Sequence, residues 1–274
     1  MLELTRKIWD GDDYVPKTWQ DWLKDHQGLL GVAELRGRVV GIGKLTRLSQ
    51  DDWWLEGLRV HPQFEGQRIA SRIHTYLLKS WEKMGSGTIR FATVSTREPV
   101  KHLAKVNGFH LAGEYSTFKS QWTNYERKKK NPFSQIEIHE NQILLNWLLS
   151  PNPKRLPFGL MDLGWQFASP HPDYLDEYLG EKKSWWWHKQ DGVVIMVEKI
   201  DGEETWGRVR LIASQTENLV EILTDLHLLA DRLGYAGITW LAPLVPGIEG
   251  ITSQAGYIRD WDSSLLVFEK SSTR

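Results

Sequence analysis

The chain has 274 residues, a formal net charge of −1 at pH 7 and no cysteine. A near-neutral chain has no general attraction to nucleic acid, and without cysteine it has no disulfide, thiol nucleophile or thiolate metal site. No apolar run is long enough to cross a membrane, and no signal-peptide pattern is visible. We therefore expect a cytoplasmic protein of about two domains, with no metal, membrane or nucleic-acid partner.

The first 120 residues alternate between strand and helix patterns. Apolar residues recur at helical spacing in three segments, and β-rich runs bounded by glycine or turn residues separate them. The predicted helices are 18–24, 68–84 and 98–106, and the predicted strands are 29–35, 39–48, 53–60, 88–94 and 111–117. Arg36-Gly37-Arg38 is expected to be the turn of a hairpin between the first two strands.

The loop after the third strand has the composition of an anion-binding loop. The strand ends at Val60, Pro62 turns the chain, Gly66 is the one glycine, and the next helix begins at about Arg68. The first amides of a helix have no intrahelical acceptor and carry a partial positive charge. Backbone N–H groups here are therefore predicted to hold a diphosphate, and an ordinary strand-to-helix connection is the alternative.

The same loop resembles motif A of the GNAT superfamily, the acyl-CoA-dependent N-acetyltransferases. Val60, Pro62, Gly66, Ile69 and Ala70 match the motif. Two positions depart from it, because Glu65 stands where the family prefers Arg or Gln, and Arg68 where it prefers Gly. The resemblance covers about residues 1–120 and includes Gly108-Phe109, a second family hallmark.

This resemblance implies that acetyl-CoA is the co-substrate and that the strand end and the loop bind it. The expected acetyl-CoA-binding residues are Leu58, Arg59, Val60, Glu65, Gly66, Gln67, Arg68, Ile69, Ala70 and Ser71. The backbone of Leu58–Val60 is expected to face the acyl oxygen. Many relatives place a tyrosine, as acid for the departing thiolate, where this chain has Ala104. Tyr115, Ser95 and Thr96 are the alternative acids, although each also fits a purely structural role.

Glu56 is the predicted catalytic residue. Strict alternation would place it on one strand face with Trp54, Leu58 and Val60, and a carboxylate on an apolar face needs a reason to be there. Acetyl transfer requires a neutral amine, so a general base at this position would remove a proton from the acceptor. The strand also resembles that of aminoglycoside-type N-acetyltransferases. A structural ion pair or a solvent-exposed charge is the alternative.

The second half of the chain repeats the first. Three landmarks recur at offsets of 150, 149 and 148 residues, namely Gly57 and Gly207, Gly85 and Gly234, and Gly108 and Gly256. A near-constant offset indicates duplication of one unit. The predicted domains are residues 1–126, with the acetyl-CoA site, and residues 132–274. The basic run Arg127–Lys130 is the expected linker.

The second copy is expected to have lost the acyl-CoA site. Trp206 stands near the position of Glu56, and the segment after Leu211 has no glycine. Ser214 with Glu217 has the spacing of a capping box, which would occupy the helix amides. Trp185–Trp187 are expected either in the core of a hairpin or as aromatic surface of an acceptor cleft.

The predicted fold is thus α/β, with two GNAT-like domains that each have a mixed, mostly antiparallel sheet flanked by helices. The predicted function is transfer of an acetyl group from acetyl-CoA to the amine of a small molecule or peptide, with Glu56 as general base. A catalytically silent acyl-CoA-binding, sensing or interaction protein is the alternative. The oligomeric state, including a homodimer, is left open.

Overall fold

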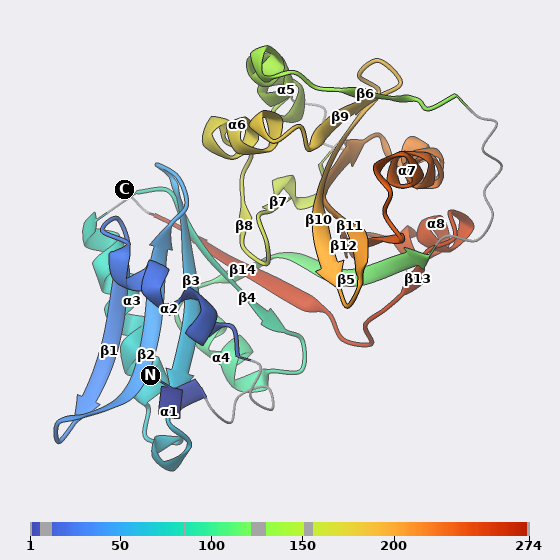
Figure 1. The fold of residues 1–274 in the computed structure, drawn as a ribbon. Coiled ribbons are helices and arrows are strands. Elements are labelled where there is room, and N and C mark those ends of the chain that lie inside the picture. Colours follow the sequence, from blue (N-terminus) through green and yellow to red (C-terminus); the bar gives the residue numbers. More distant parts are fainter. Residues whose placement is uncertain (1, 6–12, 85, 122–129, 151–155, 273–274) are drawn as a thin grey trace. The chain divides into compact units, whose positions relative to one another are not determined.

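The computed structural model describes residues 2–5, 13–84, 86–121, 130–150 and 156–272. The chain divides into two compact units, one made of residues 1–93, 97–111 and 267–274 and the other of residues 94–96 and 112–266 (Figure 1). Both are mixed α/β units with mainly antiparallel strands, which confirms the predicted fold class. Most of the predicted linker, residues 127–129, lies outside the described residues.

The first unit has a sheet with the strand order β1-β2-β3-β4-β14. β3 and β4 are parallel, whereas β1 and β2, and β2 and β3, are antiparallel. Its elements are α1 (Leu2–Thr5), α2 (Val15–Lys24), β1 (Leu29–Leu35), β2 (Arg38–Arg47), β3 (Asp52–Val60), the short 3₁₀ helix η2 (Pro62–Phe64), α3 (Ile69–Met84), β4 (Thr88–Val94), α4 (Glu98–Val106) and β14 (Leu265–Ser271).

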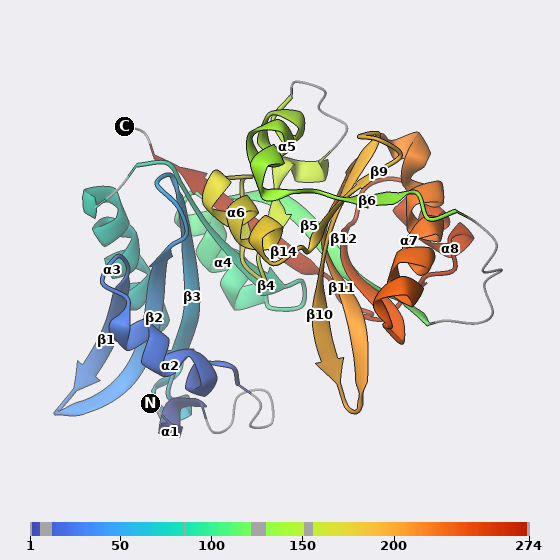
Figure 2. The ribbon, with the colours of Figure 1, turned by 45° about the horizontal axis from the view of Figure 1, so that its top comes forward.

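Helices cover both faces of this sheet (Figure 2). The amphipathic helix α3 packs on β1, β2 and β3, and its Ile73 and Leu77 meet the buried Trp53 of β3. On the opposite face, Trp22 of α2 packs against Ile42 of β2. α2 begins three residues earlier than predicted because Pro16 is accommodated in its first turn, where a proline N–H is not needed.

The last strand of the first unit comes from the C-terminal end of the chain. β14 lies beside β4, where Arg90 donates to Glu269 at 2.8 Å and the hydroxyls of Thr88 and Ser271 are 3.3 Å apart. β5 (His110–Gln121) instead pairs antiparallel with β12 of the second unit. Each unit therefore contains a strand from the other half of the sequence.

The second unit has a sheet with the order β5-β12-β11-β10-β9-β6 and a separate two-stranded sheet of β7 and β8. Its further elements are β6 (Phe133–Gln135), η3 (Ile138–Glu140), α5 (Asn141–Leu148), η4 (Pro157–Gly159), β7 (Met161–Asp162), β8 (Phe167–Ala168), α6 (Pro172–Gly180), β9 (Ser184–Trp187), β10 (Gly192–Asp201), β11 (Glu204–Ser214), η5 (Thr216–Asn218), α7 (Leu219–Leu233), β12 (Gly237–Pro243), α8 (Ile248–Gln254) and β13 (Ile258–Arg259).

Both faces of the second sheet are buried, which explains three consecutive tryptophans in β9. Trp185 and Trp187 pack toward α7, and Trp186 packs toward α5 and α6. All three side chains are buried. The interpretation of this segment as core of a β-hairpin is therefore correct, and its interpretation as exposed aromatic surface is wrong.

The two units share local details beyond their landmarks. After α4, Gly108 has φ +75° and the Phe109 amide donates to the carbonyl five residues back; after α8, Gly256 has φ +82° and Tyr257 does the same. Both are Schellman-type helix ends, which need glycine in the left-handed region. The two helices therefore end in the same way, and the duplication of one unit stays a prediction.

Candidate active site

β3 contains a bulge at the position of Glu56 and Gly57. In the pairing of β2 with β3, Ile42 of β2 lies opposite Arg59 and Lys44 lies opposite Glu56. Between these two pairs β3 therefore has one residue more than β2. Trp53, Leu55 and Leu58 consequently pack into the same core with α3. The prediction that Glu56 shares a face with Leu58 is wrong, because the bulge shifts the alternation by one residue.

Gly57 makes this bulge possible. Its φ is +61°, and a Cβ atom at this position would overlap the indole ring of Trp22. Only glycine combines the left-handed backbone with this close approach. The Gly57 amide donates to the hydroxyl of Tyr14 at 3.1 Å, so the start of α2 holds the bulge from the side of Glu56.

Glu56 is partly buried and held by a neighbouring strand. The Thr46 hydroxyl donates to Glu56 Oε1 at 2.5 Å. Tyr14 lies close enough to be affected by the carboxylate. Although 39% of the Tyr14 surface is exposed, its hydroxyl lies against β3, and burial together with the Glu56 charge raises the Tyr14 pKa to about 12. Tyr14 therefore stays a neutral hydroxyl beside Glu56 at neutral pH.

Sequence reasoning missed Tyr14 and Thr46, which lie far from Glu56 in the chain. Arg59, a predicted acetyl-CoA contact, directs its side chain to Asp13, with two hydrogen bonds of 2.8 and 3.0 Å. The Arg59 guanidinium also lies 5.5 Å from the centre of the Tyr14 ring. Arg59 thus fixes the segment that carries Tyr14.

Beyond the bulge, β3 and β4 separate. They pair in parallel only from Asp52 to Trp54, although β3 continues to Val60. The His61 amide donates to Val40 at 2.9 Å, and alternate residues of an antiparallel pair point their backbone groups to opposite edges. Val60 therefore directs its N–H and C=O toward the edge that β4 has left, where an extended ligand is able to pair with them.

The loop between η2 and α3 has the backbone shape of an anion cradle. Gly66 has φ +77°, and Arg68 has φ +59°, a conformation that costs most non-glycine residues. Arg68 thus has the left-handed backbone conformation that would favour glycine, the residue that the motif prefers at this position. Among the described residues, none accepts a hydrogen bond from the amides of Gly66–Ser71. A Cβ on Gly66 would meet nothing within 4 Å, so the space beside Gly66 is open.

The side chains around the cradle leave the approach mostly positive. Glu65, Gln67, Arg68 and Ser71 are exposed, whereas Ile69 and Ala70 are half-buried at the start of α3. Arg72, one turn into the helix, is also exposed. Because Glu65 is exposed to solvent, its charge is screened and does not need to oppose a bound phosphate.

The corresponding loop of the second unit is built differently, and the predicted capping box is wrong. Ser214 ends β11, and its hydroxyl donates to the Gln215 carbonyl, not to a helix amide. The tight turn η5 uses the amides itself, since Asn218 donates to Gln215 at 3.0 Å and Leu219 donates to Thr216. Two amides of this turn, those of Asn218 and Leu219, are thus occupied by backbone carbonyls.

The alternative thiolate acids fall in the second unit. Ser95, Thr96 and Tyr115 all belong to it, and the Tyr115 ring packs against Phe167 with centroids 4.5 Å apart. Ala104 is fully buried in the first unit.

The predictions of no metal and no membrane stay predictions. His188, Glu221 and Asp225 bring three ligand atoms within 4.8 Å, but the Asp225 carboxylate accepts the Trp187 indole N–H at 2.9 Å. None of the helices in the described part of the chain is long and apolar enough to cross a membrane.

The geometry defines an α/β protein in which the Gly66–Ser71 loop, whose amides have no acceptor among the described residues, follows a strand that parts from its parallel neighbour. Residues 2–109 match the Acetyltransferase (GNAT) family. The chain is 30% identical over 71 residues to a histidine N-acetyltransferase of Oreochromis niloticus, a match that covers 26% of this chain and 21% of that protein. It therefore spans about a fifth of the length of this curated relative.

The matches to solved structures cover nearly the whole chain. A GCN5-related N-acetyltransferase from Sphaerobacter thermophilus has a TM-score of 0.61 and 10% identity, covering 98% of this chain and 90% of that one. A tandem GNAT protein from the clavulanic acid biosynthesis pathway has a TM-score of 0.51 and 9% identity, with coverages of 91% and 85%. The match to the GNAT acetyltransferase family thus covers residues 2–109, most of which belong to the first unit.

Proposed function

We propose that this protein transfers the acetyl group of acetyl-CoA to the amine of a small molecule. The observation that supports this most directly is the open row of amides from Gly66 to Ser71, at the start of α3 and next to the separated strands. Backbone donors at a helix N-terminus fit a diphosphate, and the GNAT family uses acetyl-CoA.

The proposed roles follow from position. Acetyl-CoA supplies an activated acyl group with a thiolate as leaving group. Residues Gly66–Ser71 hold the diphosphate through their amides, and within Leu58–Val60 it is the backbone of Val60 that faces the acyl part. Glu56 removes the proton that the acceptor ammonium must lose, and the Thr46 hydroxyl holds its carboxylate in place.

The acceptor is proposed from the relative's name. The Oreochromis niloticus protein is a histidine N-acetyltransferase, so the α-amine of histidine is the first acceptor to test for this chain. We further propose that residues 1–126 and 132–274 are two copies of one ancestral unit and that only the first binds acetyl-CoA. The tight turn η5, which uses its own amides, supports this difference.

The decisive experiment measures thiol release from acetyl-CoA by the full chain with L-histidine, other amino acids, polyamines and aminoglycosides. Calorimetry with CoA is run in parallel. Amine-dependent thiol release supports the proposal. Tight CoA binding without release for any amine supports the silent-binding alternative, and absence of CoA binding contradicts both.

A further inference from the structure

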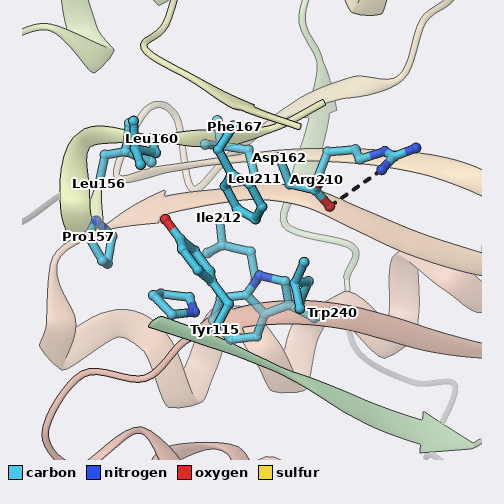
Figure 3. Close-up of a pocket in the computed structure, with 12 residues that line it drawn as sticks. Tyr115, Leu156, Pro157, Leu160, Asp162, Phe167, Arg210, Leu211, Ile212 and Trp240 are labelled. Carbon is cyan, nitrogen blue, oxygen red and sulfur yellow. Dashed lines mark hydrogen bonds and ion pairs between the residues drawn. The ribbon is translucent and has the colours of Figure 1, made fainter. Parts of the chain in front are cut away.

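The space between the separating strands of the second unit is too small for a ligand. β11 and β12 pair in parallel only over Gly207–Val209. The cavity beside them, lined in part by Tyr115, Leu160 and Trp240 (Figure 3), has a volume of about 20 Å³, which is room for a water molecule. This space therefore does not give the second unit a ligand site.

A cluster of three potential metal ligands lies at α7 of the same unit. Glu221 and Asp225 are one turn apart on this helix, so their side chains share a face. His188, in the turn between β9 and β10, places its Nε2 atom 3.9 Å from Glu221 Oε1 and 3.8 Å from Asp225 Oδ2. One ligand atom from each of the three residues lies within 4.8 Å of the other two. The fold thus brings an imidazole nitrogen and two carboxylate oxygens together from two separate elements.

Asp225 is a buried carboxylate without a cationic partner of its own. Its side chain is 8% exposed, and within the described part of the chain it forms no ion pair with a lysine or arginine. Its Oδ2 atom accepts the Trp187 indole N–H at 2.9 Å, whereas its Oδ1 atom has no hydrogen-bond partner among the described residues. The neutral indole orients the carboxylate but does not balance its charge, and a buried carboxylate without a cation is costly. The side on which His188 and Glu221 lie is where a cation is able to reach it.

The turn that carries His188 is fixed in an unusual backbone conformation. His188, Lys189 and Gln190 have φ values of +42°, +55° and +90°, a region that most non-glycine residues avoid. The His188 amide donates to the Pro132 carbonyl at 3.2 Å, and the Gln190 carbonyl accepts the Trp147 indole N–H at 3.0 Å. These two contacts hold the turn, so the imidazole has a fixed starting position beside α7. A metal ligand needs such a fixed position.

We propose that His188, Glu221 and Asp225 bind a Zn²⁺ ion at the surface of the second unit. Zinc accepts imidazole and carboxylate ligands together, whereas Mg²⁺ and Ca²⁺ prefer oxygen ligands. Ligand atoms around a tetrahedral zinc ion are about 3.4 Å apart, so the three atoms need to draw together by about 1 Å. The side chains of His188 and Glu221 are exposed and have room for this movement. The Trp187 indole N–H holds Asp225 in place, as hydrogen bonds to metal-binding carboxylates do, and water completes the coordination.

The sequence analysis expected no metal because these three residues lie far apart in the chain. Bound zinc would connect the β9–β10 turn to α7. It has no part in acetyl transfer, and it should stabilise the second unit because the unfolded chain does not keep the three ligands together.

The test is calorimetry of the full chain with zinc chloride, with excess Mg²⁺ present to occupy sites made of oxygen ligands alone. The wild type should bind Zn²⁺ saturably. His188→Asn should weaken this binding about a hundredfold, because asparagine tolerates the left-handed backbone of the turn but removes the imidazole ligand. His171→Asn is the matched control. His171 also lies beside a carboxylate, that of Asp173 at 3.4 Å, but it belongs to no group of three ligands among the described residues, so this variant should bind zinc as the wild type does.

Anomalous X-ray scattering at the zinc absorption edge, from a wild-type crystal soaked in zinc chloride, gives a measurement that does not depend on how the variants fold. A peak between His188, Glu221 and Asp225 would support the proposal. It would be overturned by the absence of saturable zinc binding, by unchanged affinity in His188→Asn, or by anomalous peaks at other residues only. None of these results bears on CoA binding, so the proposed acetyltransferase function is tested separately.

Discussion

Acidification should destabilise both units through one buried histidine in each. His74 on α3 is 5% exposed and lies against Phe91 and Phe109, and neither ring nitrogen has a hydrogen-bond partner among the described residues. His227 on α7 is 8% exposed and stacks on Tyr257. Burial lowers both pKa values to about 4, and for His74 the charge of Lys270 acts in the same direction.

The direction and size of this pH effect on the free energy of unfolding follow from the difference in proton binding between the unfolded and folded states. An unfolded histidine has a pKa of about 6.5, so between pH 6.5 and 4 the unfolded state binds more protons than the folded state. Stability is complete above pH 6.5 and falls as the pH drops to about 4. A shift of roughly 2.5 pKa units corresponds to about 3 kcal/mol per histidine, and about 2 kcal/mol of this is lost by pH 5.

Urea unfolding at pH 7 and pH 5, followed by tryptophan fluorescence, measures this effect. His74→Leu fits the apolar surroundings and should lose about 2 kcal/mol less than the wild type between these pH values. His102→Leu changes an exposed histidine on α4 and should behave as the wild type does. An unchanged pH dependence in His74→Leu would refute the conclusion that His74 is folded in its neutral form.

Three further predictions concern ligand binding and turnover. Gly66→Asp should weaken CoA binding about a hundredfold because it adds a negative charge beside the diphosphate, whereas Gly66→Asn tolerates the same backbone and should retain most affinity in calorimetry. Once an acceptor is found, Glu56→Gln should lower turnover about a hundredfold at pH 7. The deficit should be smaller at high pH, where the acceptor amine is already neutral. Turnover near that of the wild type at pH 7 would mean that Glu56 has a structural role only. The full chain should bind one CoA, and two equivalents would show that the second loop also binds.

The sequence predicted local elements well because their signals are local. The strand Thr88–Val94 and the helix Glu98–Val106 have the predicted bounds, and α3 begins one residue later than expected. Apolar spacing, together with glycine and proline at the ends, is sufficient to define such segments. The open shape of the Gly66 loop was also predictable, since one glycine and a helix start determine most of it.

Bulges and long-range pairings were not predictable from single-residue alternation. The core-facing positions of β3 change from the odd-numbered Trp53 and Leu55 to the even-numbered Leu58. The sequence shows this change only when Gly57 is taken as a break in the alternation of the strand. Tyr14 reaches the Glu56 site because α2 packs on β3, which no local signal shows. Similarly, Ser214 and Glu217 have capping-box spacing, but β11 extends through Ser214 and takes it out of the helix start.

Each unit takes one strand of its sheet from the other half of the sequence. The first unit uses β14 from the C-terminal end, where Arg90 meets Glu269, and the second uses β5, whose Phe118 pairs with Trp240. Neither half of the sequence contains its complete sheet, so a chain that ended before β14 would expose the β4 edge of the first unit. We therefore expect residues 1–126 alone to be less stable than the first unit of the full chain, and a lower urea midpoint for that fragment would show it.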